Sequence, residues 1–207
     1  MQAQAEVSQG IKNRVVTNSL VSIVAKVIYL LALLAVPPII LSYISLEEYG
    51  VWTYCFIAIG YVGMSVMGFS TVFILAGADY IATRDLAKLN GMVATGFWLS
   101  CGAGLILLVL CWLSTPWLVN SLKLSPALAD KAYWLIFGSE LSFLLCITIG
   151  SLGSLIIGLQ KVIAEQTIWV ISFLLETVAM ILFFRMGLGV FSLLYAFLTR
   201  YLFVVVT

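Results

Sequence analysis

The chain has 207 residues, of which 63% are hydrophobic and 9% are charged, and its mean hydropathy is +1.17. This balance excludes a soluble globular domain and indicates a polytopic membrane protein. A net charge of +1 gives no basic surface for nucleic acid, and the lack of histidine excludes His-based acid–base chemistry. Because no phosphate-binding loop or nucleophile elbow is present either, we expect neither an enzyme nor a bound cofactor.

The chain begins with a polar segment, residues 1–14, which we expect to be cytoplasmic. The apolar run that follows is too long for a signal peptide and is interpreted as a retained first helix from about residue 15. Pro37 and Pro38 remove backbone donors near its end. They are therefore expected to kink or end this helix and to leave residues 39–44 as an outer continuation.

Apolar stretches of about 20 residues or more, without alternation of period two, predict membrane-spanning helices rather than barrel strands. Between Pro116 and Pro126, apolar and polar residues mix, so segment 115–131 is expected to contain a short helix at the outer surface. The fold class is all-α, with a six-helix transmembrane domain over residues 15–207. The six spans are expected near 15–44, 51–78, 92–114, 132–158, 163–184 and 188–207.

Lys and Arg residues beside the spans favour a cytoplasmic N-terminus. The expected cytoplasmic set is Lys12, Arg14, Arg84, Lys88 and Lys161. The expected outer set is Lys123, Lys131 and Arg185, together with Glu47 and Glu48.

Small residues recur every four positions in the span 132–158 and form a ridge: Gly138, Ser142, Cys146, Gly150, Ser154 and Gly158. Such a ridge lets a neighbouring helix approach closely, so we favour helix packing over a substrate groove. The cysteines lie inside spans without CxxC spacing and are interpreted as packing residues: Cys55, Cys101, Cys111 and Cys146.

Four charged residues lie well inside the spans: Lys26, Glu140, Glu176 and Arg200. Each costs roughly 2.5–3.5 kcal/mol at a membrane centre on insertion scales, which makes each a candidate for function. At 1.5 Å per residue, Lys26 and Arg200 approach the midplane, and the two glutamates lie about 11–12 Å below the outer ends of their spans. If adjacent, the glutamates would suit a proton- or cation-coupling site. Because the four charges sum to zero, ion pairing and cavity lining both remain open.

Two parts of the chain carry recognisable motifs. The first is Tyr43-Ile44-Ser45-Leu46-Glu47-Glu48-Tyr49-Gly50-Val51-Trp52, with Gly68-Phe69-Ser70 and a polar elbow from Arg84 to Asn90. The second is Gly158-Leu159-Gln160-Lys161, followed by Gly187-Leu188-Gly189-Val190. In their order among six spans, these motifs resemble Wzx-type polysaccharide (O-antigen) flippases of the multidrug/oligosaccharidyl-lipid/polysaccharide exporter superfamily.

The resemblance covers nearly the whole chain but implies only one lobe of a MATE-like flippase fold, whose members carry two six-helix lobes around a central cavity. With the C-terminal lobe absent, we expect a partial chain or a half-transporter that pairs with a second protomer. The resemblance implies translocation of a polyprenyl-diphosphate-linked oligosaccharide through the lipid bilayer of the bacterial inner membrane by alternating access. A glycan polymerase is a further partner under this interpretation.

The implied substrate gives the four charges candidate roles. Lys26 and Arg200 would hold the diphosphate through charge-assisted hydrogen bonds. Glu140 and Glu176 would couple transport to a proton or sodium gradient. Two alternatives stay open: a cation-coupled multidrug exporter of the same superfamily, and a non-transporting membrane scaffold for glycan assembly.

Overall fold

The computed structural model of the protein describes the backbone of residues 2–65 and 67–206. Side chains are described there except at residues 2–15, 58–59, 61–65, 67, 69, 127, 143–147, 149 and 151. The described residues form helices and turns without a strand, which confirms the all-α prediction. The helices are α1 (Gln2–Leu41), α2 (Leu46–Ser65), α3 (Met67–Thr83), α4 (Leu86–Ser121), α5 (Pro126–Gly158), α6 (Val162–Arg185) and α7 (Phe191–Val206).

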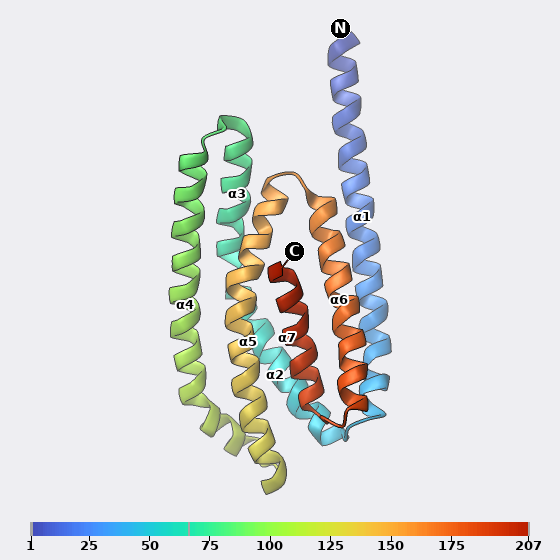
Figure 1. Cartoon of the computed structure of the whole chain (residues 1–207), viewed down its shortest axis with the longest axis vertical. Helices are drawn as coiled ribbons and strands as arrows, with labels where there is room; N and C mark the ends of the chain where they lie inside the picture. Colours follow the sequence, from blue (N-terminus) through green and yellow to red (C-terminus); the bar gives the residue numbers. More distant parts are fainter. Residues whose placement is uncertain (1, 66, 207) are drawn as a thin grey trace.

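The first helix differs from its predicted limits at both ends. It begins at Gln2, so the polar segment expected before residue 15 is helical, and Figure 1 shows it projecting beyond the other helices. The helix also runs through Pro37 and Pro38 and ends at Leu41. The prolines remove only their own backbone donors, and the residues after them still complete one more turn before the chain leaves the helix.

The middle of the chain corrects two further boundaries. The predicted span 51–78 is occupied by α2 and α3, and residue 66 between them lies outside the described residues. The expected surface helix within 115–131 is wrong, because α4 continues through Pro116 to Ser121. The chain then turns at 122–125, and α5 begins with Ser125 as the residue before its first turn and Pro126 at its first position. Proline is favoured there because its missing donor would be unsatisfied in any case.

Three helical segments of the described residues are long and apolar enough to cross a membrane: Val16–Leu41, Leu86–Ser121 and Val162–Arg185. Ser70–Thr83 and Phe191–Val206 are apolar but shorter. The chain therefore has the character of a helical membrane protein.

The connections between helices gather at two ends of the bundle. Figure 1 shows the α3–α4 and α5–α6 connections at the end nearer the N-terminus, and the α1–α2, α4–α5 and α6–α7 connections at the opposite end, which we name the hairpin end. The cations beside these connections are thereby divided as the sequence predicts, with Arg84 and Lys161 at one end and Lys123 and Arg185 at the other. The side chains of Lys12 and Arg14 lie outside the described residues. Which end faces the cytoplasm stays a prediction.

Helices α5 and α7 lie between α3 and α4 on one side and α1 and α6 on the other (Figure 1). A buried apolar cluster joins α1, α2, α4, α5, α6 and α7 near the hairpin end, and it includes Ile40, Trp52, Leu135, Phe184 and Phe197. This cluster fixes the α6–α7 hairpin against the rest of the bundle.

The small-residue ridge of α5 packs against two different helices. A Cβ added at Gly158 would collide with the backbone of Ile74 in α3, and one added at Gly138 would lie 2.5 Å from Leu194 Cδ2 in α7. Gly150, by contrast, faces open space, and the side chain of Cys146 lies outside the described residues. The packing prediction is confirmed at Gly138 and Gly158.

Candidate functional site

Arg200 and Glu176 are brought together by the α6–α7 hairpin. The two residues lie at equal sequence distance on either side of Leu188, within a turn where Gly187 and Gly189 have φ angles of +81° and +56°. Glycine adopts these left-handed angles without steric cost, so the turn is tight and the helices return antiparallel. Arg200 Nη1 donates to Glu176 Oε2 at 3.1 Å, with the two side chains 15% and 20% exposed. Counting outward from the turn would have identified this pair from sequence.

Aromatic rings surround the Arg200 guanidinium. Its Cζ atom lies 5.4 Å from the ring centroid of Trp169, 5.9 Å from Phe173 and 5.8 Å from Tyr201. Tyr29 of α1 meets Trp169 and Phe173 edge-on, at 5.2 and 5.7 Å between centroids. Cation–π attraction and the ion pair together stabilise the buried charge. We name Tyr29, Trp169, Phe173 and Tyr201 the aromatic cage.

Arg200 lines two cavities. The first, of about 250 Å³, lies among α1, α2, α6 and α7, and its walls include Pro37, Trp52, Phe56 and Glu176. The second, of about 500 Å³, lies among α5, α6 and α7 and includes Gly150, Glu165, Trp169, Ser172 and Tyr201. We name them the α1–α2 cavity and the α5–α7 cavity. Arg200 thus forms part of the wall of both.

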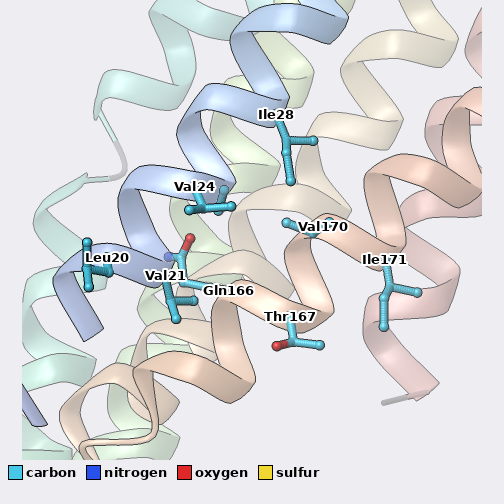
Figure 2. A pocket seen from close by; sticks show the side chains of 9 residues that line it. Leu20, Val21, Val24, Ile28, Gln166, Thr167, Val170 and Ile171 are labelled. Carbon is cyan, nitrogen blue, oxygen red and sulfur yellow. The ribbon is translucent and has the colours of Figure 1, made fainter. Parts of the chain in front are cut away.

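A third cavity, of about 330 Å³, runs between α1 and α6 and is almost entirely apolar; we name it the α1–α6 groove. Figure 2 shows Leu20, Val21, Val24 and Ile28 on its α1 side, with Gln166 extending toward them from α6. The Gln166 amide donates to Glu165 Oε2 at 2.7 Å. The groove therefore contributes no charged group of its own to a site.

Lys26 lies apart from Arg200. Its side chain is exposed on α1 and lines neither cavity nor the α1–α6 groove. Within the described part of the chain, the ion pairs are those of Lys88 with Asp79, Lys131 with Glu48 and Arg200 with Glu176, so Lys26 has no ion-pair partner there. The two cations that the sequence analysis expects to hold one diphosphate do not meet within the described structure of this chain.

Glu140 belongs to a different cluster from Glu176. Thr115 Oγ1 of α4 lies 3.4 Å from Glu140 Oε1, and Tyr54 and Cys55 of α2 and Cys111 of α4 are its titratable neighbours. Glu140 Oε2 is buried and has no hydrogen-bond partner in the described structure, whereas the buried Ser139 side chain interacts with the Cys55 thiol. The two glutamates thus have separate partners. The described cysteines, Cys55, Cys101 and Cys111, are free thiols.

Glu48 acquires a structural role that the motif resemblance did not predict. The backbone N–H of Glu48 donates to Ser45 Oγ at 3.2 Å, and the Ser45 N–H donates to Glu48 Oε2 at 3.3 Å. This reciprocal pair is a capping box at the start of α2, and Ser-x-x-Glu is its sequence signature. Glu48 Oε1 also accepts from Lys131 Nζ of α5 at 2.9 Å. Burial alone would raise the pKa of Glu48, but Lys131 and Ser45 together lower it below the ordinary value.

Comparisons with family models, with curated proteins and with solved structures gave no match for this chain. Its function is therefore argued from the sequence motifs and from the geometry of its charged residues.

Proposed function

We propose that the chain is one six-span lobe of a flippase that moves polyprenyl-diphosphate-linked oligosaccharide across the bacterial inner membrane by alternating access. In this proposal α2 and α3 form one span together, and the other helices form one each. The observation that carries it is the position of Arg200, a largely buried cation that lines two cavities deep inside an apolar bundle. A cation there would offset the desolvation of a diphosphate as it crosses the apolar layer.

The hydrogen bonding of Arg200 supports exchange between an internal and a transported anion. A guanidinium has five N–H donors in a planar fork, and Nη1 donates to Glu176. A diphosphate in either cavity would offer oxygens to the other donors, and it would compete with Glu176 for the charge. The aromatic cage would keep the guanidinium in place as these partners exchange.

The exposure of Lys26 supports the presence of a second lobe or protomer beside this one. An exposed ammonium group in the middle of α1, between exposed apolar residues such as Val24 and Val27, would cost roughly 2.5–3.5 kcal/mol against lipid. A second lobe or protomer over this face would relieve that cost. Lys26 and Arg200 would then both contribute to a cavity between two lobes.

Glycan export by the protein in its native membrane tests the proposal. Lys26→Ala and Arg200→Ala are expected to reduce export strongly, and Arg200→Lys partly, because lysine keeps the charge but lacks the bidentate fork. Matched controls are Lys123→Ala and Arg185→Ala, which remove exposed cations at the hairpin end. Unchanged export by the first two variants, at normal membrane levels, would exclude the diphosphate role.

A cation-coupled multidrug exporter is the second candidate, and the lining of the α1–α2 cavity favours it. Tyr29, Trp52, Phe56 and Phe173 line it beside the Glu176–Arg200 pair, and aromatic rings of this kind attract an apolar cation. Drug resistance and surface-glycan staining, measured on the same deletion strain, separate the two candidates. Loss of resistance with normal surface glycan would favour the exporter over the flippase.

A further inference from the structure

One carboxylate that lines the α5–α7 cavity has no cation partner in the described part of the chain. Glu165, in the first turn of α6, is partly buried there, and its Oε2 accepts from the neighbouring Gln166 amide at 2.7 Å. The ion pairs among the described residues use Asp79, Glu48 and Glu176 instead. A partly buried carboxylate in an apolar bundle is costly unless a donor or a cation reaches it. The cavity therefore offers a site for a positively charged hydrogen-bond donor.

Arg200 supplies the opposite charge in the wall of the same cavity. Its Nη1 donates to Glu176 Oε2, and the described residues provide no acceptor for Nη2 or Nε. A guanidinium fork binds phosphate oxygens through such paired donors. Arg200 therefore offers donors to an anion while its bond to Glu176 is kept.

The spacing of the two charged groups selects the ligand. Glu165 lies one helical turn before Trp169, about 6 Å along the axis at a rise of 1.5 Å per residue. The Trp169 ring, which also lines the cavity, has its centroid 5.4 Å from Arg200 Cζ. A ligand that reaches both groups must carry a cation and an anion on a short linker. Phosphoethanolamine has this form, with a phosphate and a primary ammonium two carbons apart, and a hydrogen bond of roughly 3 Å at each end extends its reach.

The walls of the cavity favour a lipid over a soluble zwitterion. Apolar side chains make up most of the remaining lining: Leu152, Ile156, Ile168, Val204 and Val205. Leu202 and Val205 of α7 are exposed, so the cavity opens toward the apolar surface of the bundle. A Cβ added at Gly150 or Gly153 would meet nothing within 4 Å, so α5 leaves room for a head group. The volume of about 500 Å³ lies within the range of small-molecule sites, roughly 300–1,000 Å³.

We propose that the α5–α7 cavity binds the head group of a phospholipid with a primary amine, of the phosphatidylethanolamine type. The ammonium donates to Glu165, the phosphodiester oxygens accept from Arg200, and the acyl chains follow the apolar wall toward Val205. This inference goes beyond the proposed transport function and does not rest on it. The lipid is a resident ligand, and the α1–α2 cavity stays open to a transported substrate.

Native mass spectrometry of the full chain tests the site. The delipidated protein in detergent is mixed with equal amounts of phosphatidylethanolamine, phosphatidylglycerol and phosphatidylcholine that carry identical acyl chains. We expect the ethanolamine lipid to bind about tenfold more than the glycerol lipid, the effect of one charge-assisted hydrogen bond. It should also exceed the choline lipid, whose quaternary ammonium has no N–H to donate. Equal binding of the three lipids, or a preference for the choline lipid, overturns the proposal.

Glu165→Gln should abolish the preference over the glycerol lipid, because an amide lacks the charge that holds the ammonium. Glu47→Gln removes an exposed carboxylate at the hairpin end, and as the matched control it should keep the preference. A preference that survives Glu165→Gln overturns the proposal. If Glu165→Gln does not fold, Gly153→Leu decides, because it fills the cavity without changing a charge. Unchanged binding of the ethanolamine lipid to Gly153→Leu would contradict the assignment.

Glycerophosphoethanolamine, which has the same head group without acyl chains, separates a lipid from a soluble ligand. At the concentration of the lipid, it is expected to leave the bound phosphatidylethanolamine in place. Displacement would assign the cavity to a soluble zwitterion and overturn the lipid. None of these measurements follows glycan export, so the lipid site and the flippase proposal fail separately.

Discussion

The α6–α7 hairpin and the α4–α5 pair each hold one glutamate inside the bundle, but they surround it differently. Glu176 faces a cation and a group of aromatic rings beside two cavities. Glu140 faces a threonine hydroxyl, thiols and a tyrosine, with no cation among the described residues. The difference teaches that depth in the membrane does not determine the role of a charged residue, because the neighbours supplied by other helices decide whether it has a partner of opposite charge.

The largest effect is expected from removing one side of the Glu176–Arg200 ion pair. Glu176→Gln leaves Arg200 buried and unpaired, and arginine cannot lose its proton, so we expect a loss of about 3–5 kcal/mol in unfolding free energy. Arg200→Met should cost less, because Glu176 can take up a proton. The measurement is reversible unfolding in detergent micelles.

The double variant Glu176→Gln/Arg200→Met completes the cycle. It should recover much of the loss, since no charge remains to be desolvated. Losses that simply add would show that the two side chains do not depend on each other.

The next effect tests the close packing on the α3–α5 side. Gly158→Ala places a methyl group against the backbone of Ile74, which cannot move as a flexible side chain does, so we expect a loss of about 1–3 kcal/mol. Gly150→Ala is the matched control on the same helix. It meets open space and should leave stability unchanged or raise it by up to about 1 kcal/mol, through better helix propensity. Equal effects at the two positions would contradict the packing.

A smaller effect tests how α1 holds the Arg200 region. Tyr29→Leu removes two edge-on ring contacts, with Trp169 and Phe173, and should cost about 0.5–1.5 kcal/mol beyond the change in buried area. Tyr195→Leu removes one such contact, with Phe183, at a 43% exposed position, and should cost less. A larger loss for Tyr195→Leu than for Tyr29→Leu would show that the aromatic cage does not stabilise the fold. Unfolding midpoints measured in parallel give the comparison.

The smallest effect is the pH dependence of the Glu48–Lys131 pair. Because the folded pKa of Glu48 lies below its ordinary value of 4.5, the pair stabilises the protein above that pH and loses its effect as the pH falls through the folded value. Lys131 is half exposed, so the contribution is expected to stay below about 1 kcal/mol.

Lys131→Met should therefore be less stable than the wild type at neutral pH, with the difference vanishing in acid. Lys123→Met, which removes an exposed cation in the α4–α5 turn, serves as the control. A difference that grows on acidification would show that the pair does not favour the ionised form of Glu48.

Local patterns carried the sequence predictions that succeeded. Long apolar runs predicted helices, and the positions of Arg84, Lys161, Lys123 and Arg185 predicted which connections share an end. The ridge on α5 predicted close packing at Gly138 and Gly158. Predicted helix ends were wrong where a single proline was taken to end a helix, as at Pro116. A helix packed along its length can lose one backbone hydrogen bond and continue.

What the sequence by itself determined is the helical, membrane-type character of the chain and the division of its connections between two ends. Hydrophobic length and turn residues act over short stretches, so they can be read without neighbours. Only the tertiary structure decided what surrounds each charge. Lys26 and Arg200 have similar predicted depths, yet one is exposed and the other is paired and enclosed by rings. Pairing depends on how each helix is rotated and on which helix lies beside it, and these are set by packing across the whole bundle.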